Sequence, residues 1–222
     1  MSLEIACSSA ADNSMRALSS DQRVAVATNR QAFLTSHNIA MANTTLVHLA
    51  YQGDDFCRYQ ALRDSDKGDG MVSQSTLVLD GAVVTTPGHA LFLPLADCVG
   101  AIIHDPTKGI LMLSHLGRHN LEQFGGTKSI EYLIKEHGVN PRDITVWLSP
   151  AASKEHYPLF AFNNRGLHEV ATEQLIQAGV QPQNITISPI DSAADQNYYS
   201  HSQFLKGNRH DDGRFAVVAM MR

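Results

Sequence analysis

The feature that most constrains this chain is a stretch from Leu93 to Leu121 in which short apolar segments alternate with turn residues and polar groups. The first segment ends at Ala96-Asp97-Cys98, the second covers Val99 to Ile103, and the third starts at Ile110 and leads into Ser114-His115. Apolar runs this short, separated by turn chemistry, indicate buried strands rather than helices. A thiol and an imidazole thus stand at the ends of neighbouring strands, where we expect them to lie close together.

The connection between the second and third segments is predicted to be a turn over residues 104–109. Pro106 fixes its own φ angle, and Gly109 tolerates a positive one.

Cys98 and His115 allow two chemical interpretations and one structural interpretation. A thiolate beside an imidazole can bind a metal, or the two can act as nucleophile and base. Alternatively, Cys98 is a small core hydrophobe and His115 a hydrogen-bonded residue at a strand end. The chain contains no CxxC or HExxH pattern, so spacing alone favours the structural interpretation.

Composition excludes several classes of protein. With 222 residues and 43% hydrophobic content, the chain can bury one core, and we expect a single domain over residues 1–222. The net charge of −5 means that the chain has no excess of lysine and arginine for binding phosphates, so nucleic acid is not an expected partner. We expect neither a secretory leader nor a membrane span. The three scattered cysteines suit a reducing cytoplasm better than a disulfide framework, and no pattern specifies an oligomeric state.

Strands and helices follow one another without a strict repeating order, which indicates the α+β class. Apolar periodicity predicts helices over roughly 22–36, 119–137 and 164–178, strands over 44–51, 69–79, 143–148, 185–190 and 214–221, and irregular segments over 1–18 and 52–67. Asp80-Gly81 is a dipeptide typical of a tight hairpin turn. Gly125-Gly126 costs the middle helix about 2 kcal/mol relative to alanine, which a close backbone approach by a neighbouring element would explain.

Several motifs, taken together in order, resemble the laccase-domain family, also called multicopper polyphenol oxidoreductase. The family includes purine nucleoside phosphorylases and the peptidoglycan-editing factor. Its pattern runs ADGxVTxxPG, ADC, HAGWRG, LGPAIG, FFSYRR and GR. The matching segments here are Asp80–Gly88, Ala96-Asp97-Cys98, His115–Arg118, Leu148–Ala152, Tyr199-Ser200-His201 and Gly213-Arg214. The resemblance implies a layered α/β/β/α sandwich with mixed sheets.

The resemblance also implies a metal site. His48 stands where the family has Gln-Val-His, so His48, Cys98 and His115 would hold a zinc ion with one coordination position open for catalysis. The segment 52–79 is longer than the family pattern leads us to expect. Copper suits the chain less well, because several coppers need histidines in HxH groupings and this chain has none.

Substrate-binding candidates follow from the same motifs. Arg118 and His119 replace the Trp-Arg pair of the family, and arginine suits phosphate through its bidentate donors. Arg118, His119 and Arg214, in that order, are the candidates for phosphate, and His201 is a further polar candidate. Asp97 should point away from Cys98, because neighbouring strand residues face opposite sides. It would then hold a ligand or a turn in place.

The resemblance favours a zinc-dependent phosphorolysis of purine nucleosides, in which adenosine or inosine and phosphate give the free base and ribose 1-phosphate. Three alternatives stand beside it: a metal-free Cys–His hydrolase or amidase, a copper-dependent polyphenol oxidase, and a non-catalytic member of the family. The last would explain the altered Trp-Arg and Arg-Arg pairs.

Overall fold

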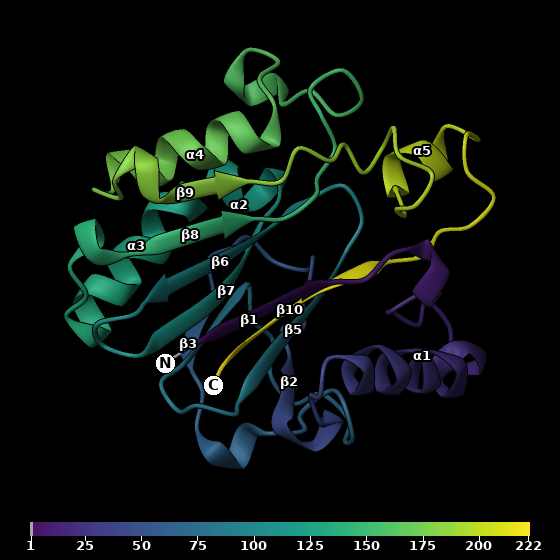
Figure 1. Ribbon diagram of the computed structural model, residues 1–222. Helices are drawn as coiled ribbons and strands as arrows, with labels where there is room; N and C mark the ends of the chain where they lie inside the picture. Colours follow the sequence, from purple (N-terminus) through teal and green to yellow (C-terminus); the bar gives the residue numbers. More distant parts are fainter. Residues whose placement is uncertain (1) are drawn as a thin grey trace.

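The computed structural model describes residues 2–222 and contains two β-sheets packed face to face, with helices on both outer faces (Figure 1). Sheet A has the strand order β1 (Leu3–Cys7), β10 (Phe215–Met221), β5 (Ala90–Leu95) and β2 (Thr44–Leu46). Sheet B has the order β3 (Tyr59–Ala61), β4 (Gly81–Val84), β7 (Ile110–Leu116), β6 (Val99–Asp105), β8 (Thr145–Leu148) and β9 (Ile185–Ile187). Both sheets mix parallel and antiparallel pairs, so the predicted α/β/β/α sandwich is confirmed.

Strand β5, in the interior of sheet A, is apolar throughout because both of its faces are buried. In β5, Leu91, Leu93 and Leu95 face the core between the sheets, whereas Ala90 and Phe92 face the core on the outer side of sheet A. Successive side chains of a strand point to opposite faces, so a strand between two cores needs an apolar residue at every position.

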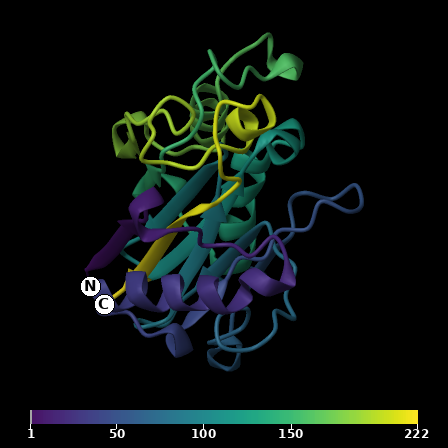
Figure 2. The ribbon, with the colours of Figure 1, turned by 90° about the vertical axis from the view of Figure 1, so that its right-hand side faces the viewer.

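The helices close the two outer faces. Helix α1 (Arg23–Ser36) packs Phe33 and Leu34 onto sheet A. Helices α2 (Arg118–Glu122), α3 (Gly125–His137) and α4 (Leu167–Gln177) cover sheet B. In Figure 2, α1 and the loops of the C-terminal half lie at opposite ends of the molecule. Short 3-10 helices occupy connections at Ala10–Asp12, Ser20–Gln22, Met41–Asn43, Asp64–Asp66, Pro141–Asp143, Phe160–Phe162 and Pro182–Asn184.

Strand β10 lies inside sheet A, antiparallel to both of its neighbours. Leu3 of β1 is opposite Met221 of β10, which brings the two ends of the chain together (Figure 1). Among residues 2–222, no helix is both long enough and apolar enough to cross a membrane.

The hairpin formed by β6 and β7 agrees with the prediction from sequence. The strands pair from Val99 opposite Leu116 to Asp105 opposite Ile110. The Asp105 carboxylate accepts hydrogen bonds from the backbone of Thr107 and Lys108, and Gly109 has a φ of 63°. This register places residue 98, just before β6, beside the end of β7.

The segment between the first predicted strand and β4 departs from the prediction. Strand β2 ends at Leu46, and residues 69–79 form turns and irregular backbone instead of a strand. The Asp69 carboxylate accepts hydrogen bonds from the Thr76 backbone and from the hydroxyls of Ser75 and Thr76, which hold this segment as a loop. The predicted hairpin at Asp80-Gly81 is also wrong, because Gly81 begins β4, which runs parallel to β3.

The long helix predicted over 119–137 is interrupted. Phe124 adopts a left-handed conformation with a φ of 61° and separates α2 from α3. The close approach expected at the two glycines is confirmed, because a Cβ atom on Gly126 would lie 2.8 Å from Cβ of Gln174 in α4. Strands β1 and β3 lie in segments predicted to be irregular, and the short helix α5 (His201–Leu205) lies in a segment left unassigned.

Candidate active site

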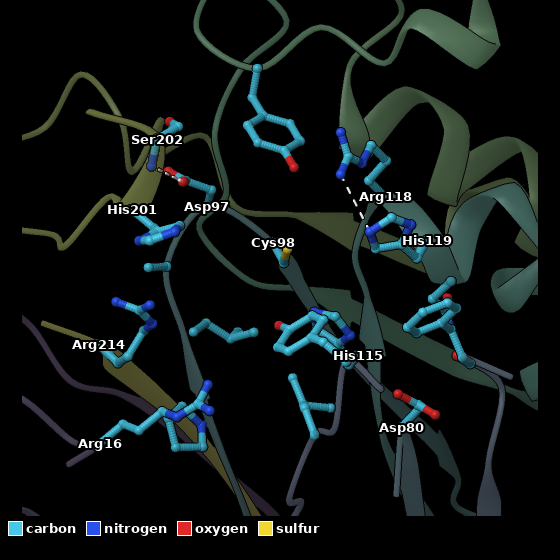
Figure 3. Close-up of a pocket in the computed structure, with 18 of the residues that line it drawn as sticks. Arg16, Asp80, Asp97, Cys98, His115, Arg118, His119, His201, Ser202 and Arg214 are labelled. Carbon is cyan, nitrogen blue, oxygen red and sulfur yellow. Dashed lines mark hydrogen bonds between the residues drawn. The ribbon is translucent and has the colours of Figure 1, made fainter. Parts of the chain in front are cut away.

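A cavity of about 500 Å³ opens where β6 begins and β7 ends (Figure 3). Six of the seven side chains proposed from the sequence line it: Cys98, His115, Arg118, His119, His201 and Arg214. His48 does not. Residues that the sequence analysis did not single out also contribute, among them Arg16, Tyr51 and Tyr157.

Cys98 and His115 face the same small space, as their strand positions predicted. A Cβ atom on Gly117 would lie 2.8 Å from Nε2 of His115 and 2.9 Å from Sγ of Cys98. Glycine is therefore required at position 117, since any side chain there would displace the thiol and the imidazole. His115 Nε2 is buried and has no hydrogen-bond partner among residues 2–222, so it is available to a ligand.

Burial keeps both groups of this pair uncharged. Burial and the charge of Asp97 raise the pKa of the Cys98 thiol to about 12, although a hydrogen bond from the Arg118 backbone opposes that rise. Burial lowers the pKa of His115 to about 4. At neutral pH the site therefore holds a thiol and a neutral imidazole. An activated cysteine nucleophile requires a thiolate, so this protonation state disfavours the Cys–His hydrolase alternative.

The three-ligand set predicted for zinc is not assembled. His48 follows the end of β2 and lines a neighbouring cavity, where its Nδ1 is buried without a hydrogen-bond partner among the described residues. In residues 2–222, no group of three or more His, Cys, Asp and Glu side chains is placed to hold a metal ion. The Val47 backbone still donates a hydrogen bond to Phe92 of β5, and His48, the next residue, lines the neighbouring cavity and not the one that holds Cys98 and His115.

A catalytic zinc takes three protein ligands and one exchangeable position. Cys98 and His115 supply two donors, so the side chains that the structure describes do not fit that site. These two donors are also too few for a multicopper centre. We therefore assign no chemical step to a metal.

Asp97 connects the strand end to two distant segments. Its carboxylate accepts hydrogen bonds from the Ser200 hydroxyl and, at 2.7 Å, from the Ser202 backbone, while its carbonyl accepts one from Ala152. It has a φ of 78°, an uncommon value for a residue other than glycine. As predicted, Asp97 holds neighbouring chain in place. Figure 3 shows the contact between Asp97 and Ser202.

Asp80 supports the opposite side of the cavity. Its carboxylate forms a bidentate ion pair with Arg58, with Nε–Oδ2 and Nη2–Oδ1 distances of 2.6 and 3.0 Å. Its carbonyl accepts a hydrogen bond from the backbone of His115. Asp80 thus ties β4 to the strand position that carries the imidazole.

The cations of the cavity differ in how far they are neutralised. Arg214 Nη1 and His201 Nδ1 both contact Oδ1 of Asp212, at 2.7 and 2.8 Å. Arg118 is exposed, and its Nη2 lies 3.3 Å from Nε2 of His119. Figure 3 shows Arg118 on one side of Cys98 and Arg214 on the other.

Arg16 is the cation that sequence reasoning missed. It forms no salt bridge within residues 2–222, and its hydrogen bonds with Ser14 use its own backbone atoms. It lies in the segment predicted to be irregular, which carries no periodic signal, and only the folded chain brings it to the cavity.

Tyr51, at the end of the strand predicted over 44–51, and Tyr157, in a predicted loop, were also missed; in the structure both lie outside the helices and strands. Burial raises the pKa of half-buried Tyr157 to about 12, and burial of the inner part of Tyr51, whose side chain is otherwise exposed, raises its pKa as well. Both tyrosines therefore present neutral hydroxyl groups at the cavity.

The sequence of the chain places it in a known family. A family profile described as multi-copper polyphenol oxidoreductase laccase matches residues 8–162. The chain belongs to this family. Family membership was predicted from the Asp80–Gly88, Ala96-Asp97-Cys98 and His115–Arg118 motifs, and this prediction is confirmed.

Curated relatives carry the name purine nucleoside phosphorylase. One from Mycobacterium tuberculosis is 28% identical over 160 residues, which cover 64% of this chain and 62% of the relative. YlmD of Bacillus subtilis is 28% identical over 102 residues, or 45% of this chain and 37% of the relative. The matched regions thus span less than two thirds of these relatives.

Solved structures share the fold over nearly the whole chain. The hypothetical protein YfiH of Bacillus licheniformis superposes with a TM-score of 0.86 at 18% identity, covering 99% of this chain and 93% of that one. YlmD of Geobacillus stearothermophilus gives a TM-score of 0.83 at 22% identity, covering 94% of this chain and 84% of that one. At these identities, the likeness concerns the fold alone.

Proposed function

We propose that this protein cleaves the glycosidic bond of purine nucleosides, with phosphate as the acceptor of the ribosyl group. The observation that carries the proposal is a cavity whose floor is neutral and whose rim is cationic. Cys98 and His115 form the floor, and Arg118 and Arg16 stand at the rim. The names of the curated relatives support the same substrate class.

The floor suits an uncharged heterocycle. The Cys98 thiol and the His115 imidazole can both form hydrogen bonds without bringing a charge against the purine. Beside them, the rings of Phe56 and His119 stack at a centroid distance of 4.8 Å and offer an aromatic surface. In the proposed complex, the base lies against this floor and the ribose points toward the rim.

The rim suits the attacking phosphate. Arg118 is the first candidate for holding it, because its guanidinium group is exposed and has no carboxylate partner among residues 2–222. Arg16, which is half-buried and forms no salt bridge within residues 2–222, is the second candidate. Arg214 ranks below both, since Asp212 neutralises it, and His119 contributes through its contact with Arg118.

In the proposed reaction, an oxygen of phosphate forms a bond to C1′ of the ribose while the bond to the purine nitrogen breaks. The electron pair of that bond stays on the purine, which takes up a proton. His201 is the proposed donor, because it lines the cavity and its Nδ1 is held by Asp212. Phosphate also stabilises the positive charge that develops on the ribosyl centre.

The zinc dependence implied by the family resemblance is not part of this mechanism. The proposal depends on hydrogen bonds and cations that the chain itself provides, and the metal content of the purified protein is a separate measurement.

The test is turnover of adenosine and inosine at varied phosphate concentration, with release of free base and formation of ribose 1-phosphate as the two readouts. Arg118→Ala should raise the KM for phosphate about 10-fold with a smaller change in kcat, since one charge-assisted contact is lost. Arg142→Ala, an exposed arginine outside the cavity, is the matched control. Base release that does not depend on phosphate would refute phosphate as the acceptor of the ribosyl group. No release at all would favour a non-catalytic role.

A further inference from the structure

A second cavity, of about 540 Å³, adjoins the candidate active site. Arg16, Leu49 and Pro94 line both cavities, so the two share a wall and a cation. The second cavity is formed by one face of α1, by the chain that follows β2 and by the loop at residues 70–75. None of the proposed catalytic groups except Arg16 belongs to it.

The lining of this second cavity is strongly cationic. Arg16, Arg23 and Arg30 all contribute to it, and the described lining contains no carboxylate. Asp69 lies nearby, but the Ser75 and Thr76 groups already occupy its oxygens. Three arginines gathered around one space repel one another unless an anion joins them.

Of the three arginines, Arg30 is held in place by the fold. Arg30 is buried, donates to the carbonyls of Met15 and Gly70 at 2.8 and 2.9 Å, and stacks over the ring of Phe92. Burial, and to a smaller extent the charge of Arg16, lower the pKa of Arg30 to about 10. Arg23, at the first position of α1, is exposed at this cavity.

Neutral donors complete the cavity. His48 lines it with an Nδ1 that is buried and has no hydrogen-bond partner in residues 2–222. Gln74 and Ser73 add an amide and a hydroxyl group. Guanidinium groups with nearby N–H and O–H donors are the chemistry that recognises a phosphoryl group.

We propose that the second cavity binds the phosphoryl group of a phosphorylated purine nucleoside whose base and ribose lie in the first cavity. This inference rests on the proposed function for the identity of the base. It assigns His48 to substrate recognition, together with Arg16, Arg23 and Arg30. Inorganic phosphate, the acceptor in the reaction, would remain with Arg118.

The experiment is calorimetric binding of adenosine and of adenosine 5′-monophosphate to the full chain and to two variants. We expect the monophosphate to bind about 10-fold more tightly, an advantage that added salt reduces. Arg23→Ala should remove most of this advantage and leave adenosine binding unchanged, because Arg23 lines only the second cavity. Arg142→Ala, which removes the same charge at an exposed site away from both cavities, should leave the affinity for both ligands unchanged.

Equal affinity for the two ligands would overturn the inference, as would an advantage that persists in Arg23→Ala. A rise in the KM for inorganic phosphate in Arg23→Ala, with the ligand preference unchanged, would also overturn it by placing free phosphate in the second cavity. Adenosine phosphorolysis without tighter binding of the monophosphate refutes this inference alone. Tighter, Arg23-dependent binding without any base release supports the subsite and refutes the proposed reaction.

Discussion

Cys98 and His115 stand at the ends of two paired, buried strands, whereas Arg16 and Arg118 reach the same cavity from a loop and from the first residue of a short helix. The strand-end pair is neutral and is fixed by sheet hydrogen bonds and by the absence of a side chain at Gly117. The rim is charged and partly exposed. The comparison indicates that the fold places the neutral pair on hydrogen-bonded strands and carries the cations of the cavity on segments outside the two sheets.

The largest difference between the two regions should appear in turnover. Cys98→Ala and His115→Ala should each lower kcat by about 100-fold or more, since each removes a hydrogen-bonding group at the reacting base. Arg118→Ala should act mainly on the KM for phosphate. Steady-state kinetics of the three variants measures the contrast. A loss of kcat in Arg118→Ala as large as in Cys98→Ala would contradict the division into a floor that acts on kcat and a rim that acts on the KM for phosphate.

Asp97 joins the two regions, so its loss should reduce stability strongly. Asp97→Ala leaves the Ser200 hydroxyl and the Ser202 N–H without their acceptor, and we expect the free energy of unfolding to fall by about 3 kcal/mol. Urea denaturation measures the change, and limited proteolysis around residues 200–212 should show faster cleavage. Asp211→Ala, at an exposed position nearby, is the control and should leave both measurements unchanged. Equal stability of the two variants would contradict the proposed connection.

The buried imidazole should make stability depend on pH. Exposed histidine in the unfolded chain titrates near 6.5, whereas burial lowers the pKa of folded His115 to about 4. Between these values, the unfolded chain binds the extra proton, so the contribution is complete above pH 6.5 and is lost as the pH falls toward 4. Its slope reaches about 1.4 kcal/mol per pH unit.

Urea denaturation between pH 7 and pH 4.5 tests this dependence. His115→Gln should flatten part of the slope, and His210→Gln, at an exposed site, should not. Other buried histidines, among them His89 and His104, also have lowered pKa values and account for the slope that remains. An unchanged slope in His115→Gln would show that the imidazole titrates normally.

The smallest effect is expected from metal removal. With only Cys98 and His115 as donors at the floor, dialysis against a chelator should leave turnover unchanged, and zinc analysis should give well below one ion per chain. One tightly held zinc per chain that disappears in His48→Ala would instead show that His48 moves to the strand-end pair. That result would restore the three-ligand site implied by the family motifs.

The sequence predicted the strand-end side of the cavity because that side depends on local patterns. Apolar runs and the Pro106–Gly109 turn determine the β6–β7 hairpin, and the hairpin alone brings residue 98 to residue 115. The family motifs then supplied the layered architecture, which periodicity could not, because strands buried on both faces do not alternate.

The remaining errors share a physical cause. His48 was placed on a strand because residues 44–51 are rich in β-branched and apolar types, yet the pairing of β2 with β5 stops at Leu46. Arg16 carries no signal in its own neighbourhood, since its place at both cavities results from contacts distant in sequence. The interruption at Phe124 depends in turn on how α2 and α3 pack against α4. Long-range packing of this kind is not visible in a window of neighbouring residues.

The position of β10 inside sheet A has a consequence for how the chain folds. Because β1 pairs only with β10, the first and last strands must meet across almost the entire length of the chain before sheet A is complete. Closing such a long loop is entropically costly, and folds dominated by distant contacts form slowly. A chain shortened before Phe215 would leave the edges of β1 and β5 unpaired, and exposed strand edges of this kind promote aggregation.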